Sequence, residues 1–128
     1  PYYDPDYEKP KKVGLTTTDA IDAMVDNKIK SLYVMGEDLT HIHPNQNKIE
    51  KAIENLDLIV VQDLFLNDIA QKAHIVFGVK SAYEKTGVYV NAMRRLHLSQ
   101  PLVESDLPDD WEVIQLLDQK MGGDSNYK

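Results

Sequence analysis

Polar residues that could bind a ligand follow directly after three apolar stretches of the sequence. Gly36-Glu37-Asp38 follows "SLYVM", Gln62-Asp63 ends "LDLIVVQD", and the segment from Phe77-Gly78 to Lys85 follows "HIV". In an open parallel sheet, ligands bind beyond the carboxyl ends of the strands. A carboxylate there can accept hydrogen bonds from ribose hydroxyls, or from the N1–H and N2 amino group of guanine. These three segments are therefore the candidate binding residues.

The acidic residues among them also fit a purely structural role. Glu37 and Asp38 suit a turn, and Asp63 suits the cap of the helix expected after it. Spacing alone favours this interpretation, because acidic residues are common in turns.

Other motifs point to no particular chemistry. No G-x-G-x-x-G follows a strand and no G-x-x-x-x-G-K-[ST] is present, so neither an ordinary NAD site nor a P-loop is predicted. His41 and His43 have a spacing that suits a metal, but with no third ligand nearby in sequence we interpret them as surface loop residues. Arg94-Arg95 could meet a phosphate or lie on a solvated ribbon edge, and spacing does not decide between these roles.

The sequence suggests a binding platform rather than a reaction centre. A nucleophile, a base and an orienting group cannot be assembled from it with any specificity. Cysteine is absent, which removes disulfides, thiolate nucleophiles, cysteine-ligated zinc and iron–sulfur clusters from this chain.

The elements that must position these residues alternate between helical and extended patterns. Apolar spacing predicts helices over residues 16–28, 44–56, 66–73 and 108–123, and strands over 31–35, 56–63 and 74–79, with a loop and short ribbon over 84–100. Trp111 and the Met residues fall at core spacing, so we expect them to pack inside. Such alternation indicates βαβ units and hence a parallel sheet. We predict an α/β, three-layer Rossmann-like domain with a small, mostly parallel sheet flanked by helices.

Composition fits one globular domain. The 128 residues are 42% hydrophobic and 27% charged, with a net charge of −7. An acidic balance argues against nucleic acid as a partner, and the apolar runs are too short for a membrane span. No signal peptide is visible, and the start at Pro1 without Met suggests a piece of a longer protein. Cytoplasm is the default location. We expect a linker or arm over residues 1–13, the domain over 14–122 and a flexible tail over 123–128.

With these residues placed, the order of motifs resembles the molybdopterin oxidoreductase family, and within it the catalytic (alpha) subunit of formate dehydrogenases. The stretches that carry the resemblance are "AIDAMVDNKIKSLYVMGED", "AIENLDLIVVQDLFLNDIAQKAHIVF", "EKTGVYVNAMRR" and "PDDWEVIQLL". The similarity runs from about Gly14 to Gly122. Each motif is weak alone, but the ordered set is specific.

The resemblance implies a role in cofactor binding. In that family this segment is similar to the third, Rossmann-like domain, which holds the guanosine end of one of two molybdopterin guanine dinucleotides chelating molybdenum or tungsten. The parent activity would be oxidation of formate to CO₂, or action on nitrate or another small oxyanion. The metal ligand, any iron–sulfur cluster and the active-site His and Arg would lie elsewhere in the parent chain, so the isolated domain would not turn over. Its implied partners are the other domains of the same enzyme and electron-transfer subunits.

The family's motifs also imply which residues contact the cofactor. Gly-Glu at the first strand tip matches Gly36 and Glu37, and Gln-Asp or Ser-Asp after the second strand matches Gln62 and Asp63. The following Phe matches Phe65. The resemblance implies three further contacts. These are Lys85 of the Glu84-Lys85-x-Gly87 motif, Asn91 of the motif that ends in Arg94-Arg95, and Asp110 before Trp111. Among these, Glu37, Gln62, Asp63, Lys85 and Asp110 are the leading nucleotide contacts.

The sequence departs from the family pattern in several places. Asp38 and Leu39 replace Asn and Pro, His74 and Gly78 replace Asp and Pro, and Met93 replaces Glu. The changes at His74, Gly78 and Met93 slightly favour an alternative, in which the chain is a free-standing, non-catalytic nucleotide-binding or interaction module that kept the fold.

Overall fold

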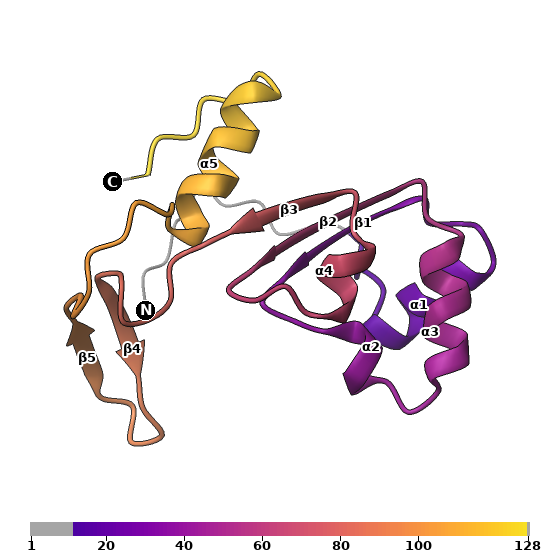
Figure 1. Cartoon of the computed structure of the whole chain (residues 1–128), viewed down its shortest axis with the longest axis horizontal. Coiled ribbons are helices and arrows are strands. Elements are labelled where there is room, and N and C mark those ends of the chain that lie inside the picture. The colour runs from indigo at the N-terminus through magenta and orange to yellow at the C-terminus, as the bar shows by residue number, and fades with distance from the viewer. Residues whose placement is uncertain (1–11, 128) are drawn as a thin grey trace.

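A parallel sheet with helices packed against it forms the first half of the chain (Figure 1). The computed structural model describes residues 12–127. Its elements in chain order are α1 (Thr17–Val25), β1 (Ser31–Met35), α2 (Leu39–Ile42), α3 (Gln46–Glu54), β2 (Leu58–Asp63), α4 (Asp68–Lys72), β3 (Ile75–Gly78), β4 (Gly87–Val90), β5 (Leu96–Ser99) and α5 (Asp110–Lys120).

The strands form two separate sheets. β1, β2 and β3 lie side by side in chain order and are parallel, whereas β4 and β5 form an antiparallel hairpin. This confirms the predicted α/β fold, with a three-stranded parallel sheet flanked by helices. Of the predicted arm, only Lys12 and Val13 lie within the described residues, and Lys128 of the predicted tail lies outside them.

Local capping explains where the helices begin. Thr16 Oγ1 accepts the backbone N–H of Asp19 at 3.2 Å and starts α1. Asn45 Oδ1 accepts the N–H of Lys48 at 3.1 Å and starts α3. In α5, Asp109 and Glu112 form a capping box, with the Asp109 N–H donating to Glu112 Oε2 at 2.7 Å.

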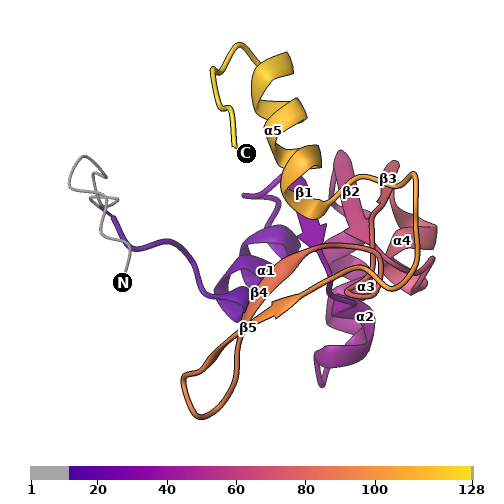
Figure 2. The same ribbon diagram turned by 90° about the vertical axis from the view of Figure 1, so that its left-hand side faces the viewer.

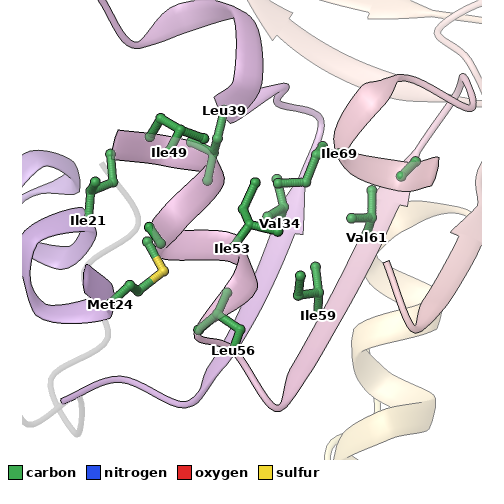
Figure 3. Packing of buried hydrophobic residues seen from close by; sticks show 12 residues of the cluster. Ile21, Met24, Val34, Leu39, Ile49, Ile53, Leu56, Ile59, Val61 and Ile69 are labelled. Atoms are coloured by element: carbon green, nitrogen blue, oxygen red, sulfur yellow. The ribbon is translucent and has the colours of Figure 1, made fainter. Parts of the chain in front are cut away.

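One apolar core lies between the sheet and helices α1 to α4 (Figure 3). Strand alternation directs Val34, Ile59 and Val61 toward the helices, where they meet the buried faces of those helices. The side chains buried there are Ile21, Met24, Val34, Leu39, Ile49, Ala52, Ile53, Leu56, Ile59, Val61, Ile69 and Ala70. Every one of them lies between residues 21 and 70, so this part of the chain has its own core.

The opposite face of the sheet is much more exposed. Tyr33, Met35, Leu58 and Ile75 are each between 38% and 47% exposed. α5 stands at the carboxyl ends of the strands, away from α1 to α4 (Figures 1 and 2).

Two expectations need correction. The four-residue helix α2 was not predicted; Asp38 begins it by accepting the N–H of Thr40 at 3.0 Å. The packing role predicted for Trp111 and the Met residues holds for Met24 alone, because Trp111, Met35, Met93 and Met121 are exposed. In α5 the one buried side chain is Val113, so this helix contributes little to a core.

Candidate functional site

A cleft of about 290 Å³ opens at the carboxyl ends of the three parallel strands. We call it the strand-tip cleft. It is lined by Gly36, Gln62, Asp63, Leu64, Val79, Lys80, Ser81, Ala82, Lys85, Tyr89 and Asp110. The structure therefore brings together five of the eight residues predicted to bind a cofactor, namely Gly36, Gln62, Asp63, Lys85 and Asp110.

Gly36 leaves free space at the tip of β1. Its φ of +62° lies in the left-handed region that favours glycine, and no atom lies within 4 Å of the position a Cβ would take. Its N–H donates to the carbonyl of Gln62 at 2.9 Å, which ties the tips of β1 and β2 together. The backbone at this point is thus both fixed and open to a ligand.

Gln62 connects the sheet to α5. Its side chain is fully buried, and its Nε2 donates to Asp110 Oδ1 at 2.9 Å and to the Asp110 carbonyl at 3.1 Å. Its Oε1 accepts the hydroxyl of Tyr33 at 2.6 Å. Because the amide is occupied on both sides, Gln62 positions its neighbours and has little capacity left for a ligand.

Asp110 and Lys85 form an ion pair at the edge of the cleft, with Nζ 2.5 Å from Oδ2. Burial acts to raise the pKa of Asp110, but the hydrogen bonds from Lys85 and Gln62 outweigh it, so the pKa lies below its usual value. Burial, followed by the charge of Asp110, raises the pKa of the Tyr33 phenol. Lys85 has the longer side chain of the two, which can turn toward an anionic ligand without movement of the backbone.

Asp63 shapes the turn after β2. Its Oδ1 accepts the N–H groups of Leu64 at 2.6 Å and Phe65 at 3.2 Å, and its Oδ2 accepts the side-chain amide of Asn67 at 3.1 Å. The cap of α4 is Asn67, whose Oδ1 accepts the N–H of Ala70 at 3.0 Å. The interpretation of Asp63 as the helix cap was therefore wrong, although the residue does stabilise the turn before the helix.

The other three predicted residues do not line the cleft. Glu37 follows Gly36 directly and is exposed, with no hydrogen bond or ion pair to its side chain within residues 12–127. Phe65 is 75% exposed. Asn91 lies at the end of β4, where its Oδ1 accepts the N–H groups of Met93 and Arg95 and holds the hairpin loop.

Of the predicted H-x-H pair, His41 is exposed and lies in α2 rather than in a loop, and His43 is half-buried. His41 Nδ1 lies 3.0 Å from Asp38 Oδ2, and its Nε2 lies 3.7 Å from Asp68 Oδ2. The N–H of Asn45 donates to His43 Nδ1 at 3.1 Å. Within residues 12–127 no group of three His, Cys, Asp or Glu side chains is placed so that it could hold a metal ion.

Comparison with protein families decides the affiliation of the chain. Residues 6–119 match the family described as "Molybdopterin oxidoreductase". The chain belongs to this family.

Relatives of this molybdopterin oxidoreductase domain are much longer proteins. A Staphylococcus aureus protein whose name proposes formate dehydrogenase activity is 38% identical over 121 residues, which are 91% of this chain and 12% of the relative. The F420-dependent formate dehydrogenase 1 subunit alpha of Methanococcus maripaludis is 37% identical over 112 residues, which are 86% of this chain and 16% of the relative. The chain thus spans a small part of these proteins.

A solved structure is likewise similar to this chain over a small part of its own length. Acetylene hydratase from Pelobacter acetylenicus superposes with a TM-score of 0.73 at 26% identity, covering 82% of this chain and 15% of that one. By name, both relatives are formate dehydrogenases, whereas this structure is that of an acetylene hydratase.

Departures of the molybdopterin oxidoreductase domain from the family pattern lie outside the strand-tip cleft. Asp38 caps α2, and Leu39 follows in its first turn and is buried, so the pair fills positions that suit Asn-Pro. His74 lies at the start of β3, where its Nδ1 accepts the N–H of Ile59 at 3.0 Å. Met93 is 69% exposed in the hairpin loop, and Gly78 does not line the cleft. None of these changes removes a group from the cleft.

Sequence reasoning missed Tyr33 and Tyr89. Strand alternation and register could have predicted the contact of Tyr33 with Gln62. Met35 pairs with Gln62, and Tyr33 lies on the same face of the sheet as Met35. The role of Glu84 was also missed. Its carboxylate accepts the N–H of Ser81 at 2.8 Å, which also lowers the pKa of Glu84, and so closes the loop that carries Lys85.

Proposed function

We propose that this chain is the domain of a molybdenum or tungsten formate dehydrogenase-like enzyme that binds the guanosine part of a molybdopterin guanine dinucleotide. The observation that carries the proposal is the strand-tip cleft, which gathers Gly36, Gln62, Asp63, Lys85 and Asp110 where open parallel sheets bind nucleotides. Family membership supports a molybdopterin cofactor in the parent enzyme.

The residues around the cleft fit a nucleotide. The open space at Gly36 admits a ligand against the backbone, and the carboxylate of Glu37 next to it can accept hydrogen bonds from guanine or ribose. Lys85 would give a positive charge to a phosphate or carbonyl oxygen. Gln62 and Asp110 would act indirectly, by holding α5 against the tip of β2, because their polar atoms already bind each other.

The bound cofactor would supply the metal centre that takes two electrons from formate, and this chain would supply anchorage. Similar domains occur in a formate dehydrogenase subunit and in acetylene hydratase. A domain shared by proteins that are named for such different reactions would perform a task common to both, such as holding the cofactor. The choice of formate as substrate would then be made by other parts of the polypeptide.

Glu37 offers the sharpest test. In the longer parent polypeptide, Glu37→Ala should lower the bound guanine nucleotide and the bound metal by about tenfold, because a hydrogen bond to a charged group contributes about 1.5–3 kcal/mol. Thermal stability should not change, since the side chain has no partner within residues 12–127. Glu54→Ala is the matched control, an exposed carboxylate at the end of α3.

Cofactor content is measured by releasing the nucleotide with acid and by metal analysis of the same sample. Wild-type nucleotide and metal content in Glu37→Ala would contradict the assigned contact. The size and metal content of the native polypeptide test the wider proposal, because a metal-free protein of about 128 residues would contradict it.

A further inference from the structure

The hairpin β4–β5 exposes one entirely apolar face. Val88 pairs with Leu98 and Val90 pairs with Leu96, so all four side chains point to the same side. Each is between 62% and 73% exposed. We call these four side chains the apolar hairpin face. Tyr89, on the other side of the ribbon, lines the strand-tip cleft.

This arrangement leaves the hairpin without support of its own. A two-stranded ribbon is at best marginally stable in water, and three or more strands or a packed helix are normally needed. No further strand pairs with either edge within residues 12–127. Figures 1 and 2 show that the hairpin extends away from the three-stranded sheet. A contiguous exposed apolar surface of this kind marks an interaction site.

Charge at the hairpin loop indicates what the partner offers. Residues 87–99 contain Arg94 and Arg95 and no acidic residue, although the whole chain has a net charge of −7. Within the described part of the chain neither guanidinium makes an ion pair. Asn91 Oδ1 accepts the N–H groups of Met93 and Arg95, at 2.9 and 3.0 Å, and so fixes the loop that presents both cations.

We propose that the apolar hairpin face docks onto another region of the longer polypeptide, on an apolar surface edged by Asp or Glu carboxylates that meet Arg94 and Arg95. The chain accounts for 12% to 16% of the length of its formate dehydrogenase relatives, so most of such a polypeptide lies outside it. The inference rests on the part of the proposed function that places this domain in a longer chain. It assigns the hairpin an interdomain role that is independent of the cofactor.

Amide hydrogen exchange of residues 88–98 tests this docking. The measurement compares the 128-residue chain with the longer polypeptide, both without cofactor. Exchange in the hairpin should be about tenfold slower or more in the longer polypeptide, because docking protects the ribbon from opening. Val90→Ser with Leu96→Ser should return it to the rate of the 128-residue chain, and Arg94→Glu with Arg95→Glu should do so in part.

A matched control separates docking from a general loss of apolar surface. Leu102→Ser with Val103→Ser removes exposed apolar side chains outside the hairpin and should leave the protection unchanged. Equal exchange in the short and long chains would overturn the proposal. So would a dimer of the 128-residue chain, seen by light scattering and lost in Val90→Ser with Leu96→Ser, since the partner would then be a second copy. Because no cofactor is present, these outcomes do not depend on the nucleotide test with Glu37→Ala.

Discussion

The two halves of this domain are stabilised in different ways. Between residues 17 and 78, helices and three strands enclose a core of twelve apolar side chains. Between residues 79 and 127, the buried apolar side chains are Val79 and Val113, and many large apolar side chains are exposed. The first half has a core of its own, whereas the second half depends on contacts with its surroundings.

The cleft lies at the junction of these halves. Gly36, Gln62 and Asp63 come from the first half, and Lys85, Tyr89 and Asp110 come from the second. The contact from Gln62 to Asp110 joins the two. A ligand bound there would contact both halves at once, so binding and the docking of the second half onto the first should stabilise each other.

The largest expected effect is in the core of the first half. Ile59→Ala removes a side chain that is 2% exposed and leaves a cavity beneath β2. We expect the free energy of unfolding to fall by about 3 kcal/mol. Urea unfolding of the 128-residue chain measures it. A loss below about 1 kcal/mol would show that the core is not the main source of stability.

The next effect is at the junction. Gln62→Leu removes the hydrogen bonds that Gln62 makes with Asp110 Oδ1 and with the Tyr33 hydroxyl, and we expect the free energy of unfolding to fall by about 2 kcal/mol. Hydrogen exchange should accelerate in α5 and remain slow in β1 and β2. The exposed Gln46→Leu is the control, expected to change stability by less than about 0.5 kcal/mol. Uniform acceleration over both halves would mean that they unfold as one unit.

A smaller effect on the free energy of unfolding should appear when the pH is lowered. Because the pKa of Asp110 is lowered in the folded state, its ionised form stabilises the fold above the unfolded-state pKa of about 3.9. That contribution is lost as the pH falls through the folded-state value. Its size should be below about 1 kcal/mol, since the pair with Lys85 is partly solvated.

Asp110→Asn should reduce the acid dependence of the unfolding free energy, measured by urea unfolding between neutral pH and about pH 2.5. The exposed Asp124→Asn is the control for the loss of one carboxylate. An Asp110 titration midpoint by NMR at or above that of an unstructured Asp would contradict the assignment.

The smallest effect is expected on the apolar hairpin face. Leu98→Ala removes a side chain that is 65% exposed, so the unfolding free energy of the 128-residue chain should change by less than about 0.5 kcal/mol. Comparison of this change with that of Ile59→Ala shows how differently similar apolar side chains contribute to stability in the two halves. A loss close to that of Ile59→Ala would show that the hairpin is already packed in the short chain.

Local patterns predicted most of the fold. The spacing of Ile49, Ala52 and Ile53 predicts α3, and the apolar run ending at Gln62-Asp63 predicts β2. α2 was missed because four residues are too few to show a period. The exposure of Trp111 was missed because helical spacing shows which side chains share a face, and not whether another element covers that face.

The site was predictable to a smaller extent. The rule on strand ends located Gly36, Gln62, Asp63 and the segment that ends at Lys85, and the family resemblance added Asp110. The hydrogen bonds that decide their roles link Gln62 to Tyr33 and to Asp110, 29 and 48 residues apart in the sequence. Contacts of that separation depend on register and on the approach of α5, which no local pattern contains.

The order of the strands also has a consequence for synthesis. β2 and β3 each pair with the strand made just before, so the first half can assemble while later residues are still being translated. Asp110 reaches Gln62 only after another 48 residues have left the ribosome. During synthesis the strand tips therefore remain uncovered until α5 has been made, and the strand-tip cleft is complete only from that point.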